Sequence, residues 1–572
     1  MPEGTETAAS FDSCCEEIAH KFVQTMVFMD DQAGYDVPTV PEVKTETPAK
    51  GLSGRSKHAI EKQNGTELNE SESSIHSHPL NVAEILESAM RNGLVCSIHK
   101  PQNKEDYNLE NLKAVISADI VCFDWIMKQG DNGEITRELV KGIIKKDIKV
   151  GGRHRLIAIY TYKPELEGIL TSIKSELDKV GADCELDASR MILTGKHFRV
   201  LGLRKEGGTQ QKEFQVSAKE LPDRLVKEFS LFNRGLISNL TMASIAILRE
   251  STAHILAKLG SNLDGPFLTH KSFLPSPQDA TTYASEIISS EFKSILHKNR
   301  VADDLLSDGL IKSYVESKDN LSFKYLNGEN KPVQTEIEDD ILYQLISLGV
   351  RNVDEKVLES LEFHIDETEQ DEDTVRKSIA LSLSSCFTSD HNSAFENNLE
   401  FLKVTKIAAD ITNKLYIKES KGGHGKSPML TLGTLVKHQK TYLLCLQPSC
   451  DSVRLSSSGS PFWFIKLSKN MERPMLVVKH DDKYVGLRYT ANIKNSKLID
   501  FKRTDTSSGS VFAEREGDKL YFTSKGEKPV KYQWIADLKV DIARKIGQEL
   551  ANQYSRIGLD EFELSRMGWK YR

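Results

Sequence analysis

The first two hundred residues alternate between short apolar runs and longer amphipathic segments. The apolar runs predict buried strands at residues 27–29, 94–98, 121–123, 155–161 and 200–204. Between them, apolar residues recur at three- and four-residue spacing, which predicts helices at residues 81–92, 109–118, 135–146 and 164–180. Strands that alternate with helices are typical of a doubly wound α/β fold with a parallel sheet.

Polar residues stand at the ends of several predicted strands. Asp30 and Asp31 follow the first strand, and Asp124 follows the strand at 121–123. Open α/β sheets hold their reactive groups at the carboxyl ends of the strands. Paired carboxylates without sulfur or nitrogen neighbours suit Mg²⁺ better than zinc. If Asp124 accepts a phosphoryl group, Thr161 and Lys205 would supply the hydroxyl and the cation that such a transfer requires.

Each of these residues also has an ordinary structural interpretation. An aspartate after a strand is common as a helix cap or a turn residue, and Asp30 with Asp31 could form a turn. A lysine after a strand says little by itself. The order of the four strand ends along the chain favours the joint chemical interpretation.

The order Asp-Asp, Asp, Thr, Lys resembles the receiver domain of two-component response regulators, which has a flavodoxin-like fold. The segment Asp124-Trp125-x-Met127 is similar to the surroundings of the phosphorylation site in that family. The resemblance implies that Asp124 takes the phosphoryl group and that Thr161 and Lys205 contact its oxygens. The Mg²⁺ ligands that it implies are Asp30, Asp31, Asp124 and the backbone carbonyl of Ile126.

The chain departs from the family pattern in several places. Residues 33–78 are rich in Pro, Ser, Glu, Lys and Gly, and we expect a disordered insertion there. Residues 183–197 stretch the interval before Lys205, so the register in this part is open. Gly202 occupies the position of the family's aromatic switch. We therefore expect phosphorylation without that switch, and an inactive receiver is the alternative.

Three domains are expected. The receiver-like domain covers residues 1–215, and an all-α region covers residues 216–414, with surfaces for a homodimer or a partner. Short strands separated by turns predict a mainly antiparallel β domain over residues 415–572. We expect its last element to be a helix at about 534–554.

The β domain offers one further candidate site. Cys445 and Cys450 are spaced like the start of a zinc site, but no second cysteine pair follows. Cys450 with Asp451 and Arg454 is the alternative centre of a hydrolase or nucleotide-acting effector enzyme. A turn with a salt bridge is the favoured interpretation.

Composition bears on location and partners. Without a run of about 20 apolar residues or the features of a signal peptide, we expect a cytoplasmic protein that does not enter the membrane. Eight cysteines suit a reducing compartment. A net charge of −7 gives no electrostatic footprint for nucleic acid, and no basic recognition helix is evident, so DNA binding is disfavoured.

These patterns lead to one hypothesis and two alternatives. We expect a signalling protein that accepts a phosphoryl group from a sensor histidine kinase and passes the signal to a downstream effector, more a phosphoacceptor than a turnover enzyme. Its layout is similar to response receiver proteins of bacterial defence operons, which implies a regulator or phosphate buffer in an anti-phage phosphorelay. The alternatives are a receiver-gated effector enzyme and a scaffold with an inactive receiver.

Overall fold

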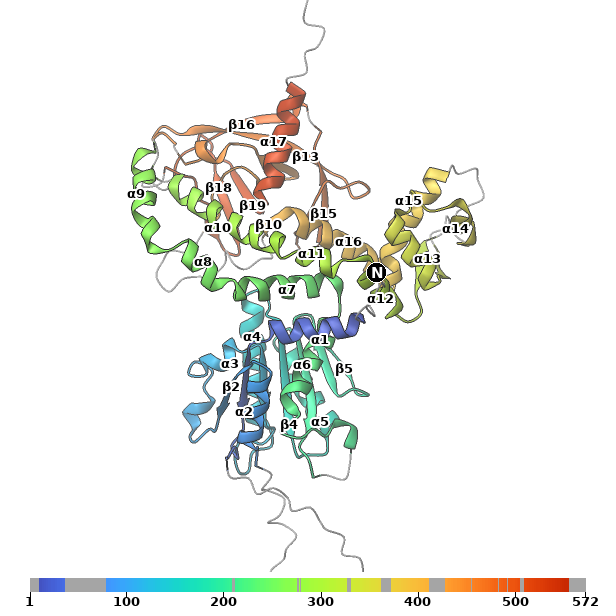
Figure 1. The fold of residues 1–572 in the computed structure, drawn as a ribbon. Helices are drawn as coiled ribbons and strands as arrows, with labels where there is room; N and C mark the ends of the chain where they lie inside the picture. The colour runs from blue at the N-terminus through green and yellow to red at the C-terminus, as the bar shows by residue number, and fades with distance from the viewer. Residues whose placement is uncertain are drawn as a thin grey trace, which may run out of the picture. The chain divides into compact units, whose positions relative to one another are not determined.

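The computed structural model describes residues 10–35, 79–207, 211–274, 277, 279–326, 331–361, 372–410, 427–453, 455–481, 483–490, 492–504 and 509–554. Residues 36–78 of the expected insertion and Arg454 lie outside the described residues. The chain forms two compact units, one within residues 9–246 and the other mainly within residues 247–572 (Figure 1).

A seven-stranded sheet forms the centre of the first unit, with the order β2-β1-β3-β4-β7-β6-β5. Its first five strands are parallel: β2 (Val95–His99), β1 (Thr25–Met29), β3 (Ile120–Phe123), β4 (Arg155–Thr161) and β7 (Phe198–Arg204). Every residue of β3, β4 and β7 is buried, which explains their near-continuous apolar sequences. The predicted parallel α/β fold is confirmed for this part of the sheet.

The sheet is mixed, because two antiparallel strands that the sequence did not predict extend the parallel part at one edge. The stretched interval before Lys205 forms an antiparallel hairpin of β5 (Cys184–Asp187) and β6 (Ile192–Gly195). Strand β6 pairs with β7, with Ile192 opposite Leu201. Strand β7 is therefore an interior strand, and β5 forms this edge of the sheet.

Helices cover both faces of this sheet (Figure 1). One face carries α3 (Lys113–Ser117), α4 (Glu134–Lys149) and α5 (Leu166–Asp178), whose apolar side chains share a core with the strands. On the other face α2 (Val82–Arg91) packs beside α6 (Leu221–Phe232), which contacts β4.

An unforeseen helix, α1 (Phe11–Phe22), packs on α6, where the rings of Phe22 and Phe229 stack at 5.9 Å. Leu225 and Phe229 of α6 are fully buried. This packing carries the first unit past the expected boundary at residue 215, to Ala246.

The helical part of the second unit is not entirely helical. Its helices include α8 (Thr252–Lys258), α9 (Asp264–Phe273), α10 (Asp279–Lys298), α11 (Val301–Leu305), α12 (Asp308–Glu316), α13 (Asp339–Gln344), α14 (Glu355–Ser360), α15 (Glu372–Ser382) and α16 (His391–Lys406), and α7 (Leu236–Glu250) precedes them. The expected all-α region also contains an antiparallel hairpin, β8 (Ser322–Leu326) and β9 (Pro332–Glu336). Phe323 of this hairpin is fully buried in a core that it shares with the surrounding helices.

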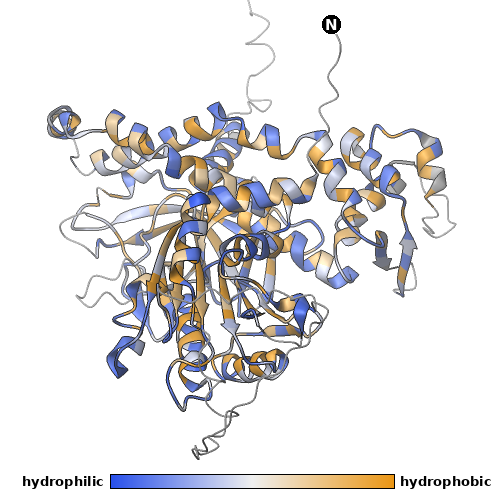
Figure 2. Ribbon diagram, turned by 60° about the horizontal axis from the view of Figure 1, so that its bottom comes forward, coloured by the Kyte–Doolittle hydropathy of each residue, from blue (hydrophilic) through white to orange (hydrophobic). Residues whose placement is uncertain are grey.

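The mainly antiparallel β domain is confirmed. The strands in its described residues are β10 (Ile407–Asp410), β11 (Thr434–His438), β12 (Thr441–Cys445), β13 (Ser460–Lys469), β14 (Leu476–His480), β15 (Lys483–Arg488), β16 (Ser496–Phe501), β17 (Glu514–Glu516), β18 (Lys519–Thr523) and β19 (Lys531–Leu538). Apolar residues gather along the strands of both units (Figure 2). The last helix, α17 (Val540–Tyr554), begins later than expected because residues 532–536 form a fully buried part of β19.

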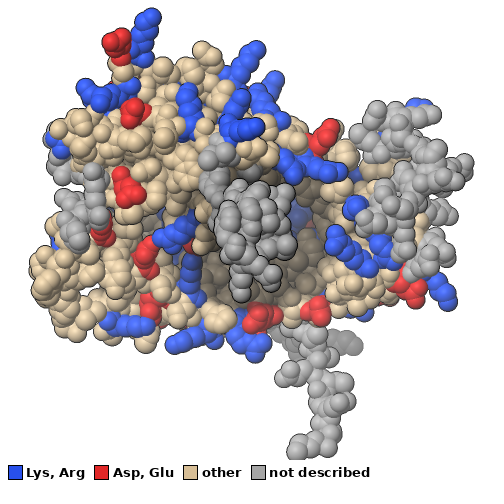
Figure 3. Space-filling view, turned by 90° about the horizontal axis from the view of Figure 1, so that it is seen from above, with Lys and Arg blue, Asp and Glu red and all other residues tan. Residues whose placement is uncertain are grey.

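On the face drawn in Figure 3, basic and acidic side chains are scattered among uncharged residues. No helix in the described part of the chain has the length and apolar character needed to cross a lipid bilayer.

Candidate functional site

Three parallel strands end at one edge of the first sheet. Asp30, Asp124 and Lys205 are the residues directly after β1, β3 and β7. Their backbones remain hydrogen-bonded to neighbouring segments: the Asp124 N–H donates to the Met29 carbonyl at 3.0 Å, and the Lys205 N–H donates to the Thr161 carbonyl at 3.0 Å. The side chains therefore project from rigid elements, which suits a site that needs fixed geometry.

A buried ionic cluster occupies this edge. The Lys205 ammonium lies 2.7 Å from Asp30 Oδ2 and 2.6 Å from Asp124 Oδ2, and the exposed fractions of the three side chains are 8%, 3% and 11%. Carboxylate oxygens of Asp30, Asp31 and Asp124 all lie within 4.8 Å of one another. Three carboxylates face one ammonium, so the cluster is net negative when all are ionised, and a further cation would relieve the repulsion.

The pKa values reflect this crowding. Burial raises the pKa of Asp124 to about 6, with Asp30 adding to the shift and Lys205 opposing it. Burial and then the charge of Asp30 raise the pKa of Asp31. Burial lowers the pKa of Lys205, but Asp124 and Asp30 outweigh that effect and the net direction is upward. The lysine therefore stays charged, while two of the carboxylates hold their protons more strongly than usual.

The residues present fit a magnesium ion. Oδ1 of Asp31 is buried, and no group in the described part of the chain donates a hydrogen bond to it. The Ile126 carbonyl likewise receives no hydrogen bond from a described residue. These atoms and the three carboxylates form an oxygen-only donor set, which is the set that Mg²⁺ prefers. Of the magnesium ligands predicted from the sequence, the carboxylates of Asp30, Asp31 and Asp124 lie together, and a role for the Ile126 carbonyl stays a prediction.

Thr161, the remaining predicted site residue, ends β4, between β3 and β7. Its side chain is almost fully buried, and its hydroxyl accepts a hydrogen bond from the Lys163 N–H at 3.3 Å. Its predicted contact with the phosphoryl oxygens stays a prediction.

Sequence reasoning missed three residues that hold the loop after β3. The Asp131 carboxylate accepts hydrogen bonds from the N–H groups of Met127 and Glu134, each at 3.1 Å, and so fixes the start of α4. An aspartate three residues before a helix is a recognisable signal. Thr136 and Tyr107, whose hydroxyls donate to loop carbonyls, carry no such signal because their partners lie 11 to 20 residues away.

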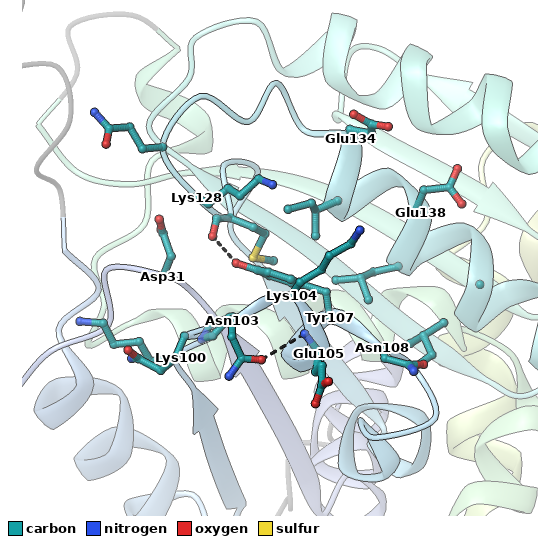
Figure 4. Close-up of a pocket in the computed structure, with 18 residues that line it drawn as sticks. Asp31, Lys100, Asn103, Lys104, Glu105, Tyr107, Asn108, Lys128, Glu134 and Glu138 are labelled. Atoms are coloured by element: carbon teal, nitrogen blue, oxygen red, sulfur yellow. Dashed lines mark hydrogen bonds between the residues drawn. The ribbon is translucent and has the colours of Figure 1, made fainter.

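A cleft of roughly 1370 Å³ opens beside the cluster, between the β2–α3 connection and α4. Figure 4 shows Asp31 at one end of the cleft with Lys100 and Lys128 near it, and Glu134 and Glu138 farther along. The cleft gives an approach to the cluster from the side of Asp31.

The cysteine candidates have no comparable setting. Cys445 is fully buried in β12, whereas Cys450 is exposed and its thiol donates to Asp451 Oδ1 at 3.4 Å. Among the described residues, only Asp30, Asp31 and Asp124 bring three potential metal ligands together. The described part of the β domain therefore contains no such zinc cluster.

A flavodoxin-like sheet with an acidic cluster and a lysine at its strand ends defines a receiver-type signalling domain. Residues 22–210 match the family model described as the response receiver domain, and this part of the chain is a domain of that family. The match ends before α6 and before the second unit. Searches of curated proteins and of solved structures found no match. Receiver domains act in two-component signalling, so this is the general process to which the domain points.

Proposed function

We propose that Asp124 accepts a phosphoryl group from a sensor histidine kinase. The observation that carries the proposal is the Lys205 ammonium, held within 2.7 Å of both Asp30 and Asp124 beside the carboxylate of Asp31. A fixed cation next to an acceptor carboxylate is the arrangement that phosphoryl transfer requires, since catalysis rests on positioning and charge stabilisation.

In the transfer, an Asp124 carboxylate oxygen forms a bond to phosphorus as the bond between phosphorus and the donor's histidine nitrogen breaks. The departing imidazole takes up a proton and leaves neutral. The Lys205 ammonium neutralises charge on the phosphoryl oxygens, and the Thr161 hydroxyl donates a hydrogen bond to one of them.

Asp30, Asp31, Asp124 and the Ile126 carbonyl would hold Mg²⁺. When bound, the ion screens the repulsion between the acceptor carboxylate and the incoming phosphoryl group. Burial and Asp30 raise the pKa of Asp124 to about 6, so below that pH the carboxyl group is mostly protonated without the ion. A bound cation would favour the ionised form that accepts the phosphoryl group.

The output of the domain is a second part of the proposal. A receiver joined to a helical and β unit resembles the layout of regulators or phosphate buffers in bacterial anti-phage relays, and a downstream effector would then bind the phosphorylated form. A sensor kinase encoded next to this chain would support this role, and a gene neighbourhood without any kinase or defence protein would count against it.

Labelling with small phosphodonors tests the acceptor. Acetyl phosphate and phosphoramidate should label the wild-type protein with Mg²⁺ present and fail to do so with a chelator. Asp124→Asn should abolish the label, whereas Asp178→Asn, at an exposed position of α5, should keep it. A label that persists in Asp124→Asn, or a wild-type protein that takes no label with Mg²⁺, would refute the proposal.

A further inference from the structure

Four successive backbone carbonyls follow β3, and side-chain hydroxyls occupy three of them. The Thr136 hydroxyl donates to the carbonyls of Asp124 at 2.8 Å and Trp125 at 3.3 Å. The Tyr107 hydroxyl donates to the Met127 carbonyl at 2.6 Å, the dashed line beside Lys128 in Figure 4. Among the described residues, none donates to the carbonyl between them, that of Ile126.

The two hydroxyls reach the loop from different elements. Thr136 lies in the first turn of α4 and is fully buried, while Tyr107 ends the 3₁₀ turn η1 (Lys104–Tyr107) and is partly buried. Together they hold the peptide groups on both sides of the Ile126 carbonyl. That carbonyl lies between two anchored peptide groups, and the N–H of its own peptide group, that of Met127, donates to Asp131 Oδ2 at 3.1 Å.

We propose that Thr136 and Tyr107 are positioning residues that present the Ile126 carbonyl to magnesium. The proposal rests on the function proposed above, because it assumes the ion there. Mg²⁺ demands near-octahedral geometry at about 2.0–2.1 Å, whereas Ca²⁺ accepts longer and more variable distances. A loosened carbonyl should therefore weaken Mg²⁺ binding more than Ca²⁺ binding.

The test replaces the hydroxyls with groups of the same shape. Thr136→Val and Tyr107→Phe should each weaken Mg²⁺ binding by about 10-fold or more, as is typical when a partner that orients a metal ligand is lost. Thr136→Ser, which keeps the hydroxyl, should restore binding. Thr241→Val is the control, since its hydroxyl donates to the Ile237 carbonyl of α7, at 2.8 Å.

Calorimetric titration of the full chain with MgCl₂ and with CaCl₂ measures both affinities, and the melting temperature of the metal-free protein is recorded for each variant. A fall in melting temperature with unchanged Mg²⁺ affinity would overturn the proposal, as would equal losses for the two ions. If Thr136→Val does not fold, Tyr107→Phe and Thr136→Ser decide the question.

These outcomes separate this inference from the function on which it rests. A wild-type protein that takes the label and binds Mg²⁺, with variants that bind it equally well, would refute the positioning role alone. A wild-type protein that does not bind Mg²⁺ would refute the metal site, and the positioning role with it.

Discussion

Replacing Asp124 by asparagine should stabilise the metal-free protein, and the gain should develop as the pH rises from about 4 to about 6 and persist above that. The substitution keeps the shape of the side chain and removes one negative charge from a cluster of three carboxylates and one ammonium. The remaining Asp30 and Asp31 carboxylates then face Lys205 with less mutual repulsion.

The magnitude follows from the pKa of Asp124, which burial raises from 3.8 to about 6. Each pKa unit corresponds to about 1.4 kcal/mol, so ionising this group in the folded protein costs roughly 3 kcal/mol. The folded protein keeps the proton until about pH 6, while the unfolded chain releases it near pH 3.8. Wild-type stability therefore falls as pH rises through this window and stays low above it.

Asparagine does not titrate and escapes this loss. The raised pKa of Asp124 already includes the opposing effect of the hydrogen bond to Lys205, so this bond is not subtracted again. The expected gain is therefore up to about 3 kcal/mol at about pH 8 and close to zero at about pH 4.

Urea unfolding in the presence of a chelator measures this difference. Hydrogen–deuterium exchange of peptides covering β1, β3 and β7 would show that the transition belongs to the first unit. Asp178→Asn, an exposed change of the same kind, is the control. A wild-type protein as stable as the variant at both pH values, or a variant less stable at about pH 8, would refute the electrostatic reasoning.

Two further substitutions test the packing around the site. Arg155→Met should destabilise the first unit by about 3–5 kcal/mol in urea unfolding, because its loss leaves the buried carboxylate of Asp147 unpaired. The fully buried guanidinium pairs with Asp147 at 2.8 Å and also donates to three backbone carbonyls. A loss of stability below about 1 kcal/mol would contradict this reasoning. Gly133→Ala should lower the melting temperature more than Gly130→Ala. Both glycines have positive φ, but a Cβ at residue 133 would lie 2.0 Å from the Trp125 ring, whereas nothing lies within 4 Å at residue 130. Equal losses would show that only backbone strain matters there.

The strands of the receiver domain were predictable because of their burial. Strands β3, β4 and β7 are covered on both faces, so nearly every position is apolar and the runs stand out in the sequence. The hairpin of β5 and β6 was missed because both strands are short and β5 is half exposed. Their sequences therefore contain no long apolar run that would indicate a buried strand. The start of the last helix was misplaced because Ile535 and Leu538 fit a helical period although they belong to β19.

The acidic cluster was predictable for a different reason. Its members follow strands directly, and parallel strands bring their ends to one edge, so chain order alone indicates their proximity. The contacts of Thr136 and Tyr107 depend instead on how α4 and the turn η1 pack against the segment after β3. A single threonine or tyrosine gives no periodic pattern from which such a contact could be read.

The hairpin beside β7 has a practical consequence for measuring this domain. Strand β7 is hydrogen-bonded to β4 along one edge and to β6 along the other, so it cannot shift along its axis without breaking both sets of hydrogen bonds. The backbone that precedes Lys205 is therefore held in a fixed position. Residues 188–190, at the tip of the hairpin, are exposed to solvent and lie toward the same edge of the sheet as the end of β7. A fluorophore attached there would be carried by the same sheet as the lysine, which makes the tip a suitable reference point for distance measurements.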